Sequence, residues 1–162
     1  MSGTWTDWAV KPDNENVYDL DIDTANRDLA VTQGFDTALG CSLFSDRRAA
    51  PDEVADPWKR RGWIGNLLSP VPGDNFGSGI WLYEQSRATD AVRAAVKMEA
   101  VQALWWLVDG GLVQFVDAAT AYDPALRRLT LTITITDRLG GVSERAFPIW
   151  QKTGAKQIGT NQ

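Results

Sequence analysis

The longest regular pattern of apolar and polar positions runs from Thr89 to Val108 and predicts a helix. Thr89 can cap the first turn, and Asp90 places a negative charge at the positive end of the helix dipole. Glycines at 110 and 111 supply a stop, because glycine adopts a left-handed conformation cheaply. Neither glycine nor proline interrupts the run, and alanine, the best helix former, recurs in it.

This predicted helix carries apolar residues on two sides. One side carries Ala91, Ala94, Met98, Val101, Trp105 and Val108, and a second carries Val92, Val96, Ala100, Ala103 and Leu107. A helix that is apolar nearly all round is buried nearly all round. Two arrangements satisfy this pattern. The helix lies between two layers of its own domain, or one of its sides meets a partner protein.

Alternation of apolar and polar residues predicts the strands. Tyr18 to Ile22 places aspartates on one face and apolar residues on the other, and Leu29 to Val31 is expected to return beside it. After the helix, three strands are predicted, at 112–116 with an extension to 122, at 129–136 and at 142–150. The second of these alternates most regularly, with leucine or isoleucine on one face and threonine on the other.

A second, shorter helix is predicted from Asp36 to Ser45, with a buried stripe formed by Phe35, Leu39, Leu43 and Phe44. The fold class is therefore α+β, an antiparallel sheet with the long central helix and the shorter helix packed on one face. The expected organisation is an extended N-terminal arm at 1–16, a single α+β domain at 17–150 and a polar C-terminal tail at 151–162.

The predicted domain includes a long irregular loop at residues 49–79. Prolines and glycines interrupt it repeatedly, yet it carries Trp58, Trp63 and Phe76. A polar linker would not have this apolar content. Long loops within compact domains are usually functional or packed against other structure.

The composition and net charge of the chain exclude several classes of function. The 162 residues carry a net charge of −5, which argues against nucleic-acid binding, and no segment has membrane-spanning length and apolarity. Histidine is absent, which excludes Ser-His and Cys-His nucleophile pairs and the common zinc sites. The single cysteine, Cys41, is expected in the core. Eight tryptophans are present, several in loop-like sequence, and some are expected to be half exposed.

Three chemical alternatives are compatible with parts of the sequence. Asp19, Asp21 and Asp23 match the start of a calcium loop, but Thr24 and Ala30 stand where that loop requires glycine and glutamate. A solvated strand face is the expectation, with no metal. Glu84 lies beside aromatic residues, as the acid of a glycan hydrolase can, but no partner carboxylate is defined. Tryptophans could also stack on sugars in a glycan-binding module.

Four segments together resemble the Mu-like phage tail baseplate proteins. They are QGFDTALGCSLFSDRRA at Gln33–Ala49, RGWIGN at Arg61–Asn66, GSGIWLYEQSRAT at Gly77–Thr89 and ALWWLVDGGLV at Ala103–Val113. The resemblance implies a structural wedge subunit of a contractile-tail baseplate, with no enzymatic activity and no cofactor. It implies multiple copies in a symmetric ring, in contact with other baseplate, wedge, tail-tube and sheath proteins. The expected location is the virion, after assembly in the host cytoplasm.

That family is in turn similar to the lysozyme-like wedge proteins of other contractile tails. Those carry a Glu-Pro-Arg signature after the long helix, where this chain has Asp109-Gly110-Gly111-Leu112. No catalytic residue carries over. Because tryptophan and arginine are enriched at interface hot spots, the interface candidates are Trp5, Trp8, Arg47, Arg48, Trp58, Arg61 and Trp63.

Overall fold

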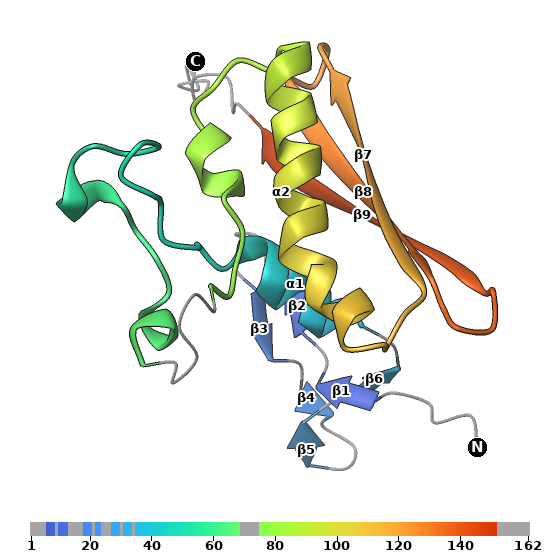
Figure 1. Cartoon of the computed structure of the whole chain (residues 1–162). Coiled ribbons are helices and arrows are strands. Elements are labelled where there is room, and N and C mark those ends of the chain that lie inside the picture. The colour runs from blue at the N-terminus through green and yellow to red at the C-terminus, as the bar shows by residue number, and fades with distance from the viewer. Residues whose placement is uncertain are drawn as a thin grey trace, which may run out of the picture. The chain divides into compact units, whose positions relative to one another are not determined.

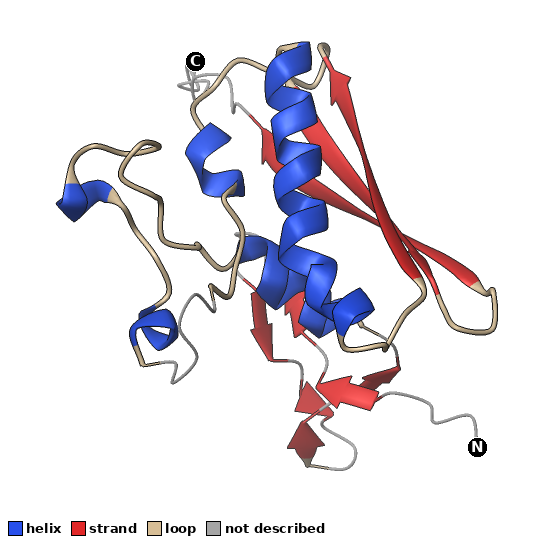
Figure 2. Cartoon of the chain, viewed as in Figure 1, coloured by secondary structure: helices blue, strands red, loops and turns tan. Residues whose placement is uncertain are grey.

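The computed structural model describes residues 35–68 and 75–151, together with residues 6–8, 10–12, 18–20, 22–23, 27–29 and 31–33. The chain divides into two compact units, Met1–Gly77 and Ser78–Gln162. The described residues contain two α-helices and a three-stranded antiparallel sheet, which confirms the predicted α+β class (Figure 2). Trp5 and the predicted tail beyond Gln151 lie outside the described residues.

The second unit is built on the long helix α2, which spans Asp90–Asp109. The Thr89 side-chain oxygen accepts a hydrogen bond from the Val92 N–H at 3.3 Å, which confirms the predicted N-cap. At the other end the left-handed glycine is Gly111, with φ +65°. The predicted start and stop of this helix are therefore both confirmed.

The sheet of this unit consists of β7 (Phe115–Asp123), β8 (Arg128–Thr136) and β9 (Val142–Gln151), hydrogen-bonded in the order β7-β8-β9. The three predicted strands are confirmed, but the first begins at Phe115 and not at Leu112. The N–H groups of Leu112 and Val113 instead donate to the Leu107 carbonyl, at 2.9 and 3.1 Å. These two residues therefore close the end of α2.

Helix α2 packs on the sheet through buried apolar side chains. Figure 1 shows the helix lying along the sheet. The helix buries Val96, Ala100, Leu104 and Leu107. The sheet buries Val116, Ala118, Leu129, Leu131, Ile133 and Ile135. These sheet residues share one face, because Ile133 stands opposite Ala118 and Ile135 opposite Val116 in the register. Burial of such side chains contributes roughly 25 cal/mol per Å² of apolar surface removed from water.

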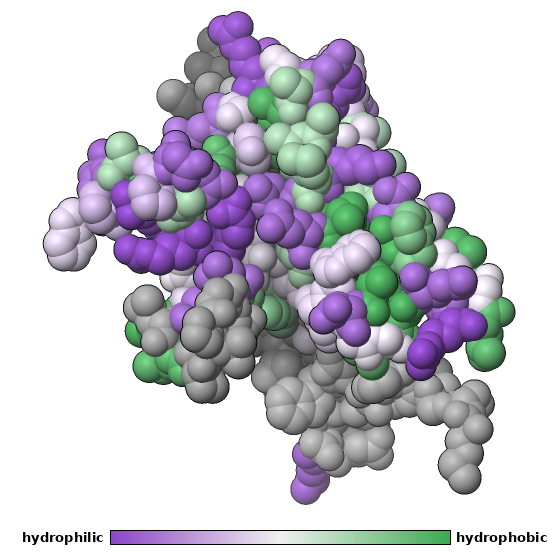
Figure 3. Space-filling view, viewed as in Figure 1, coloured by the Kyte–Doolittle hydropathy of each residue, from purple (hydrophilic) through white to green (hydrophobic). Residues whose placement is uncertain are grey.

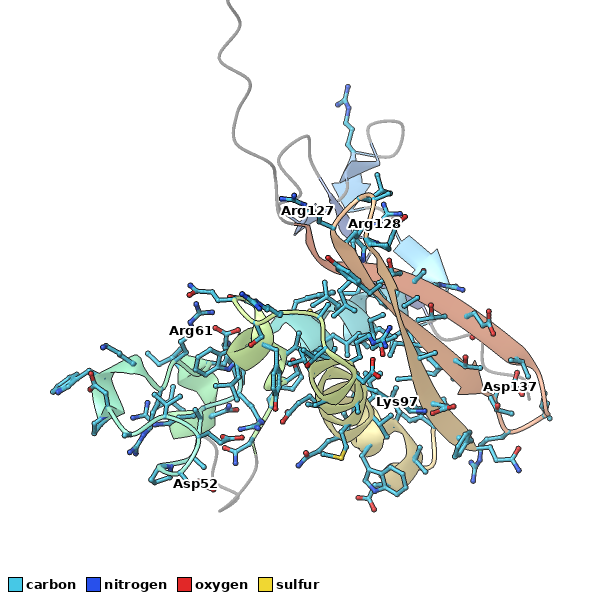
Figure 4. The ribbon with its side chains drawn as sticks, turned by 90° about the horizontal axis from the view of Figure 1, so that it is seen from above. Asp52, Arg61, Lys97, Arg127, Arg128 and Asp137 are labelled. Carbon is cyan, nitrogen blue, oxygen red and sulfur yellow. The ribbon has the colours of Figure 1, made fainter. Side chains whose placement is uncertain are left out.

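Two polar contacts fix the register between α2 and β7. The Thr120 hydroxyl donates to the Arg93 carbonyl oxygen at 3.2 Å. The Lys97 ammonium lies 3.0 Å from the Asp117 carboxylate, and its hydrogen bond holds the pKa of that carboxyl below the usual value (Figure 4). A short 3-10 turn, η3 (Ile80–Tyr83), is also tied to α2, since the Gly79 N–H donates to the Glu99 carboxylate at 2.9 Å.

The first unit begins with three two-stranded sheets. They pair β1 (Thr6–Trp8) with β6 (Val31–Gln33), β2 (Val10–Pro12) with β3 (Tyr18–Leu20), and β4 (Ile22–Asp23) with β5 (Asp28–Leu29). The strand predicted from Tyr18 to Ile22 is found as two strands with different partners, and its predicted return is confirmed in part, since Ile22 pairs with Leu29. Alternation defines which face a residue occupies but leaves the choice of partner strand open.

The shorter helix, α1, spans Asp36–Phe44. Leu39, Ser42 and Leu43 are buried because positions i, i+3 and i+4 share one helix face. Two predictions here were wrong, since Phe44 and Cys41 are both exposed. Both lie away from the direction of Leu39 on the helix wheel. After α1, the chain forms the short 3-10 turns η1 (Pro57–Lys59) and η2 (Ile64–Leu67) within the predicted long loop.

Candidate interaction surfaces

Residues 46–63 form a closed loop, called here the arginine-braced loop. The Trp63 N–H donates to the Asp46 carbonyl oxygen at 2.8 Å, and the Ala49 N–H donates to the Arg60 carbonyl oxygen at 3.0 Å. These two backbone hydrogen bonds bring the beginning and the end of the loop together. In Figure 1 the loop leaves α1 and carries η1 at its outer end.

The strongest polar interaction inside the loop is the salt bridge between Arg47 and Glu53. The two guanidinium nitrogens donate to the two carboxylate oxygens at 2.8 and 2.6 Å, a bidentate geometry. The Ala50 N–H also donates to this carboxylate at 2.8 Å. The Arg47 hydrogen bond is the main cause that lowers the pKa of Glu53 to about 2. The pair therefore stays ionised across the neutral range.

The neighbouring arginines hold backbone carbonyl groups of the same loop. Arg60 donates from Nε to the Val54 carbonyl at 2.7 Å and from Nη2 to the Ala55 carbonyl at 3.1 Å. Arg48 reaches the carbonyls of Pro57 and Arg61, both at 3.4 Å. A loop without a helix or sheet ladder must satisfy its carbonyl groups in this way or with water. The arginines thus replace the missing secondary structure.

Two glycines allow the backbone of this region to pack closely. Gly62 has φ +122°, and a Cβ there would lie 2.9 Å from the Cβ of Arg48. Gly77 has φ +105°, and a Cβ there would collide with the Ser45 carbonyl oxygen and the Arg47 nitrogen. Both positions combine a left-handed backbone with close neighbours, so only glycine suits them.

Trp58 lies in η1 and is 96% exposed. Its backbone N–H donates to the Asp56 carboxylate at 3.0 Å, and Pro57 occupies the first position of the turn. Asp56 and Pro57 thereby fix the backbone on which the indole is carried. The side chain itself is almost completely in solvent.

Trp63 differs from Trp58 because it is only half exposed. Its ring packs edge-on against Phe76, with 5.3 Å between the ring centroids and 61° between the planes. The Asn66 side chain holds the backbone of Phe76 through two hydrogen bonds, of 2.9 and 3.0 Å. Part of the Trp63 ring therefore stabilises its own unit.

The remaining interface candidates occupy different settings. Arg47 and Arg48 brace the loop as described above, and the Arg61 guanidinium lies 3.4 Å from the Asp46 carboxylate. Trp8 belongs to β1, but its side chain lies outside the described residues, as Trp5 does entirely. The arginine-braced loop brings together Arg47, Arg48, Trp58, Arg61 and Trp63.

A second surface lies on the side of α2 that faces away from its sheet. Met98 is 71% exposed and Trp105 is 52% exposed, and Ala91 and Ala94 on the same side are exposed as well. Figure 3 shows hydrophobic atoms gathered near the end of α2 and the adjacent sheet. Of the two apolar sides predicted from the sequence, one is therefore buried and the other is largely open. The helical spacing of Met98 and Trp105 indicated this surface, yet neither was among the interface candidates.

The residues considered for catalysis and metal binding have the following settings. Glu84 is exposed at the end of η3. Over the part of the chain that the structure describes, His, Cys, Asp and Glu nowhere gather in threes as a metal ion would need. The side chains of Asp19, Asp21 and Asp23 lie outside that part. None of the described helices is both long and apolar enough to cross a membrane.

Comparison of the sequence with known proteins identifies its family. The sequence profile of the family described as "Phage protein GP46" matches residues 35–142, which include α1, the arginine-braced loop, α2, β7 and β8. The chain belongs to the GP46 family of phage proteins. This membership confirms the resemblance to Mu-like phage baseplate proteins that the four sequence segments indicated.

Two relatives of the GP46 family show the extent of the similarity. The chain is 27% identical over 127 residues to "Mu-like prophage FluMu protein gp46" of Haemophilus influenzae, covering 78% of this chain and 86% of the relative. It is 32% identical over 102 residues to "Baseplate protein gp46" of Escherichia phage Mu, covering 60% of this chain and 66% of the relative.

Proposed function

We propose that this protein is a structural component of a phage tail baseplate and acts through protein–protein contacts. Its membership of the GP46 family supports the proposal, and so does the similarity to a relative named a baseplate protein. In the finer proposal it is a wedge subunit of a contractile tail. It is assembled in the host cytoplasm and contacts other baseplate, tail-tube and sheath proteins as multiple copies in a ring.

The observation that carries the proposal is the open apolar side of α2. Helix α2 buries one apolar side against its sheet and carries a second apolar side as well. Met98 and Trp105 nevertheless remain largely in solvent. Large exposed apolar side chains that cluster on a surface mark protein–protein contact sites, and tryptophan is enriched among the residues that dominate binding energy. Scaffolding contacts of this kind require neither a catalytic group nor a cofactor.

Co-assembly of the protein with other baseplate proteins of the same phage tests the proposal. The chain is coexpressed with them, and the products are separated by size exclusion with light scattering. We expect the wild-type chain in an assembly larger than one subunit. The double variant Met98→Lys, Trp105→Ser should enter it at least tenfold less, because it charges and truncates the α2 surface. Leu139→Ser is the matched control, since Leu139 is 90% exposed in the β8–β9 turn.

Circular dichroism of each variant alone verifies that the helix content is retained. A wild-type chain that stays monomeric and joins none of the baseplate proteins would contradict the proposal. Turnover of purified peptidoglycan that Glu84→Gln abolishes would replace it with an enzymatic function. A saturable change of tryptophan fluorescence on titration with peptidoglycan fragments would replace it with glycan binding.

A further inference from the structure

We infer that the arginine-braced loop presents Trp58 as a rigid anchor that inserts into an apolar pocket with an acidic rim on another baseplate protein. The inference rests on the proposed function and adds the chemistry of one partner. It concerns the first unit of the chain, whereas the proposed function is carried by α2 in the second.

The loop is held in one shape by contacts that leave its outer turn free to bind. The Arg47–Glu53 pair and the Arg60 hydrogen bonds all act within residues 47–60. The two backbone hydrogen bonds at Ala49 and Trp63 close the loop at its base. A preformed loop loses little conformational entropy on binding, so most of the contact energy is retained as affinity.

Trp58 has the exposure expected of an anchor and not of a packed residue. Its indole is 96% exposed, although Pro57 and the Asp56 cap hold its backbone in place. Exposure of a complete indole to water is unfavourable, and the described contacts of the free chain do not offset it. Burial of an aromatic anchor in a pocket is the arrangement found at interface hot spots.

The charges around Trp58 indicate an acidic partner. The segment 56–61 contains Asp56, Lys59, Arg60 and Arg61, and together with Asp46, the ion-pair partner of Arg61, it carries a net charge of +1 from three cations and two anions, whereas the whole chain carries −5. The Lys59 side chain is 78% exposed. The Asp56 carboxylate accepts a hydrogen bond from the Trp58 backbone N–H and lies 3.6 Å from the Lys59 ammonium. Figure 4 shows Arg61 and Asp52 on opposite sides of the loop. A cationic rim around an apolar anchor is complementary to an acidic rim around an apolar pocket.

The same arrangement argues for a protein pocket over a sugar. Sugar hydroxyls need nearby acceptors as well as donors, and a carboxylate provides acceptors. The carboxylate nearest to Trp58 in sequence, Asp56, is engaged by the loop itself. The exposed Lys59 beside the indole supplies donors alone.

The first test identifies the partner by photo-crosslinking in the assembled complex. Position 58 is changed, Trp58→p-benzoylphenylalanine, in the full chain coexpressed with the other baseplate proteins, and the crosslinked peptides are sequenced by mass spectrometry. We expect one partner protein, crosslinked at apolar residues flanked by Asp or Glu. Crosslinks to a second copy of this chain, or crosslinks scattered over several proteins, would overturn the inference.

The second test measures the affinity between the full chain and that purified partner. Trp58→Ala should weaken binding at least tenfold, and Trp58→Phe should weaken it less. Lys59→Glu should weaken binding most at low salt, because opposite charges steer association and are screened by ions. Leu139→Ala, which removes an equally exposed apolar side chain from the second unit, should bind as the wild type does.

The outcomes separate the two proposals. If Trp58→Ala joins the baseplate as well as the wild type does, the anchor is refuted while the structural function stands. If the wild type joins no baseplate protein at all, the structural function itself fails and the inference fails with it. Saturable binding of peptidoglycan fragments that Trp58→Ala abolishes would assign Trp58 to glycan and overturn the protein pocket.

Discussion

The arginine-braced loop and the α2–sheet unit hold their shapes by opposite means. In the unit around α2, residues such as Leu104, Leu131 and Ile133 are completely buried, and they determine how the helix lies on the strands. In the loop, by contrast, guanidinium groups hold carbonyl oxygens and a carboxylate, as Arg60 and Arg47 do. One region depends on the removal of apolar surface from water and the other on charge-assisted hydrogen bonds.

This difference determines what each region can present to a partner. In the α2 unit, the apolar side of α2 that faces away from the sheet remains exposed. The loop uses its arginines to hold its own backbone and Glu53, and it presents the Trp58 indole beside the exposed Lys59. The two regions should also respond to different perturbations. Loss of apolar volume should affect the α2 unit, and loss of charge should affect the loop.

The largest expected effect is loss of apolar volume in the sheet. Leu131 is completely buried in β8, so Leu131→Ala removes buried surface and leaves a cavity. The free energy of unfolding should fall by about 4 kcal/mol, as is typical of buried leucine truncation. Urea denaturation followed by circular dichroism measures this change.

The control for this prediction is Leu139→Ala, in the exposed turn after the same strand. It should change the unfolding free energy by no more than about 0.5 kcal/mol, as surface substitutions do. Equal effects of the two variants would refute the view that apolar burial stabilises this unit.

A smaller effect is expected in the loop on acidification. The folded loop lowers the pKa of Glu53 from 4.5 to about 2, so the stabilisation is complete above pH 4.5 and is lost as the pH falls toward 2. The full shift corresponds to roughly 3 kcal/mol, and partial solvent exposure reduces this to about 2 kcal/mol. Protection factors of the Ala49 and Trp63 amides, measured by hydrogen exchange, should fall about 30-fold over this range.

Two variants isolate the contribution of Glu53 to this acid response. Glu53→Gln should lower the two protection factors at neutral pH and remove most of their dependence on acid. Asp52→Asn changes the adjacent exposed carboxylate and should keep the wild-type response. An acid response that survives in Glu53→Gln would show that other groups hold the loop.

The smallest expected effect lies at the start of α2. Thr89→Ala removes the side-chain oxygen that accepts the Val92 N–H. The unfolding free energy should fall by about 1 kcal/mol, and the change should be visible in urea denaturation. Thr89→Ser retains the acceptor and should restore most of the loss. A serine variant as unstable as the alanine variant would exclude the cap as the cause.

The sequence predicted well those parts of the fold that repeat. Helix α2 and strand β8 each follow one period for many residues, and their faces, cap and turns were identified correctly. The sheet pairs of the first unit were predicted less well, because β3 and β4 are two or three residues long and alternate without specifying partners. Cys41 was predicted to be buried because free cysteine is usually buried, but its position on α1 lies away from the face that buries Leu39 and Leu43.

The candidate surfaces were only partly predictable, for a physical reason. An arginine in a loop sequence is equally able to hold its own backbone or to meet a partner. Arg47 and Arg48 could not be separated from an interface role until their acceptors were known. Trp58 was a candidate because tryptophan is enriched at interface hot spots, whereas the Asp56 cap of its turn and its exposure became visible only in the structure. Whether the predicted interface residues contact a partner stays a prediction.

The short connections of the β7-β8-β9 meander have a consequence for folding kinetics. Strands β7 and β8 are joined by residues 124–127, and β8 and β9 by residues 137–141, where the Asp137 carboxylate accepts the N–H groups of Leu139 and Gly141. Because contacts between neighbours in sequence close small loops, they form with little entropic cost and favour rapid folding. The meander can therefore form early in folding and serve as a template on which α2 packs.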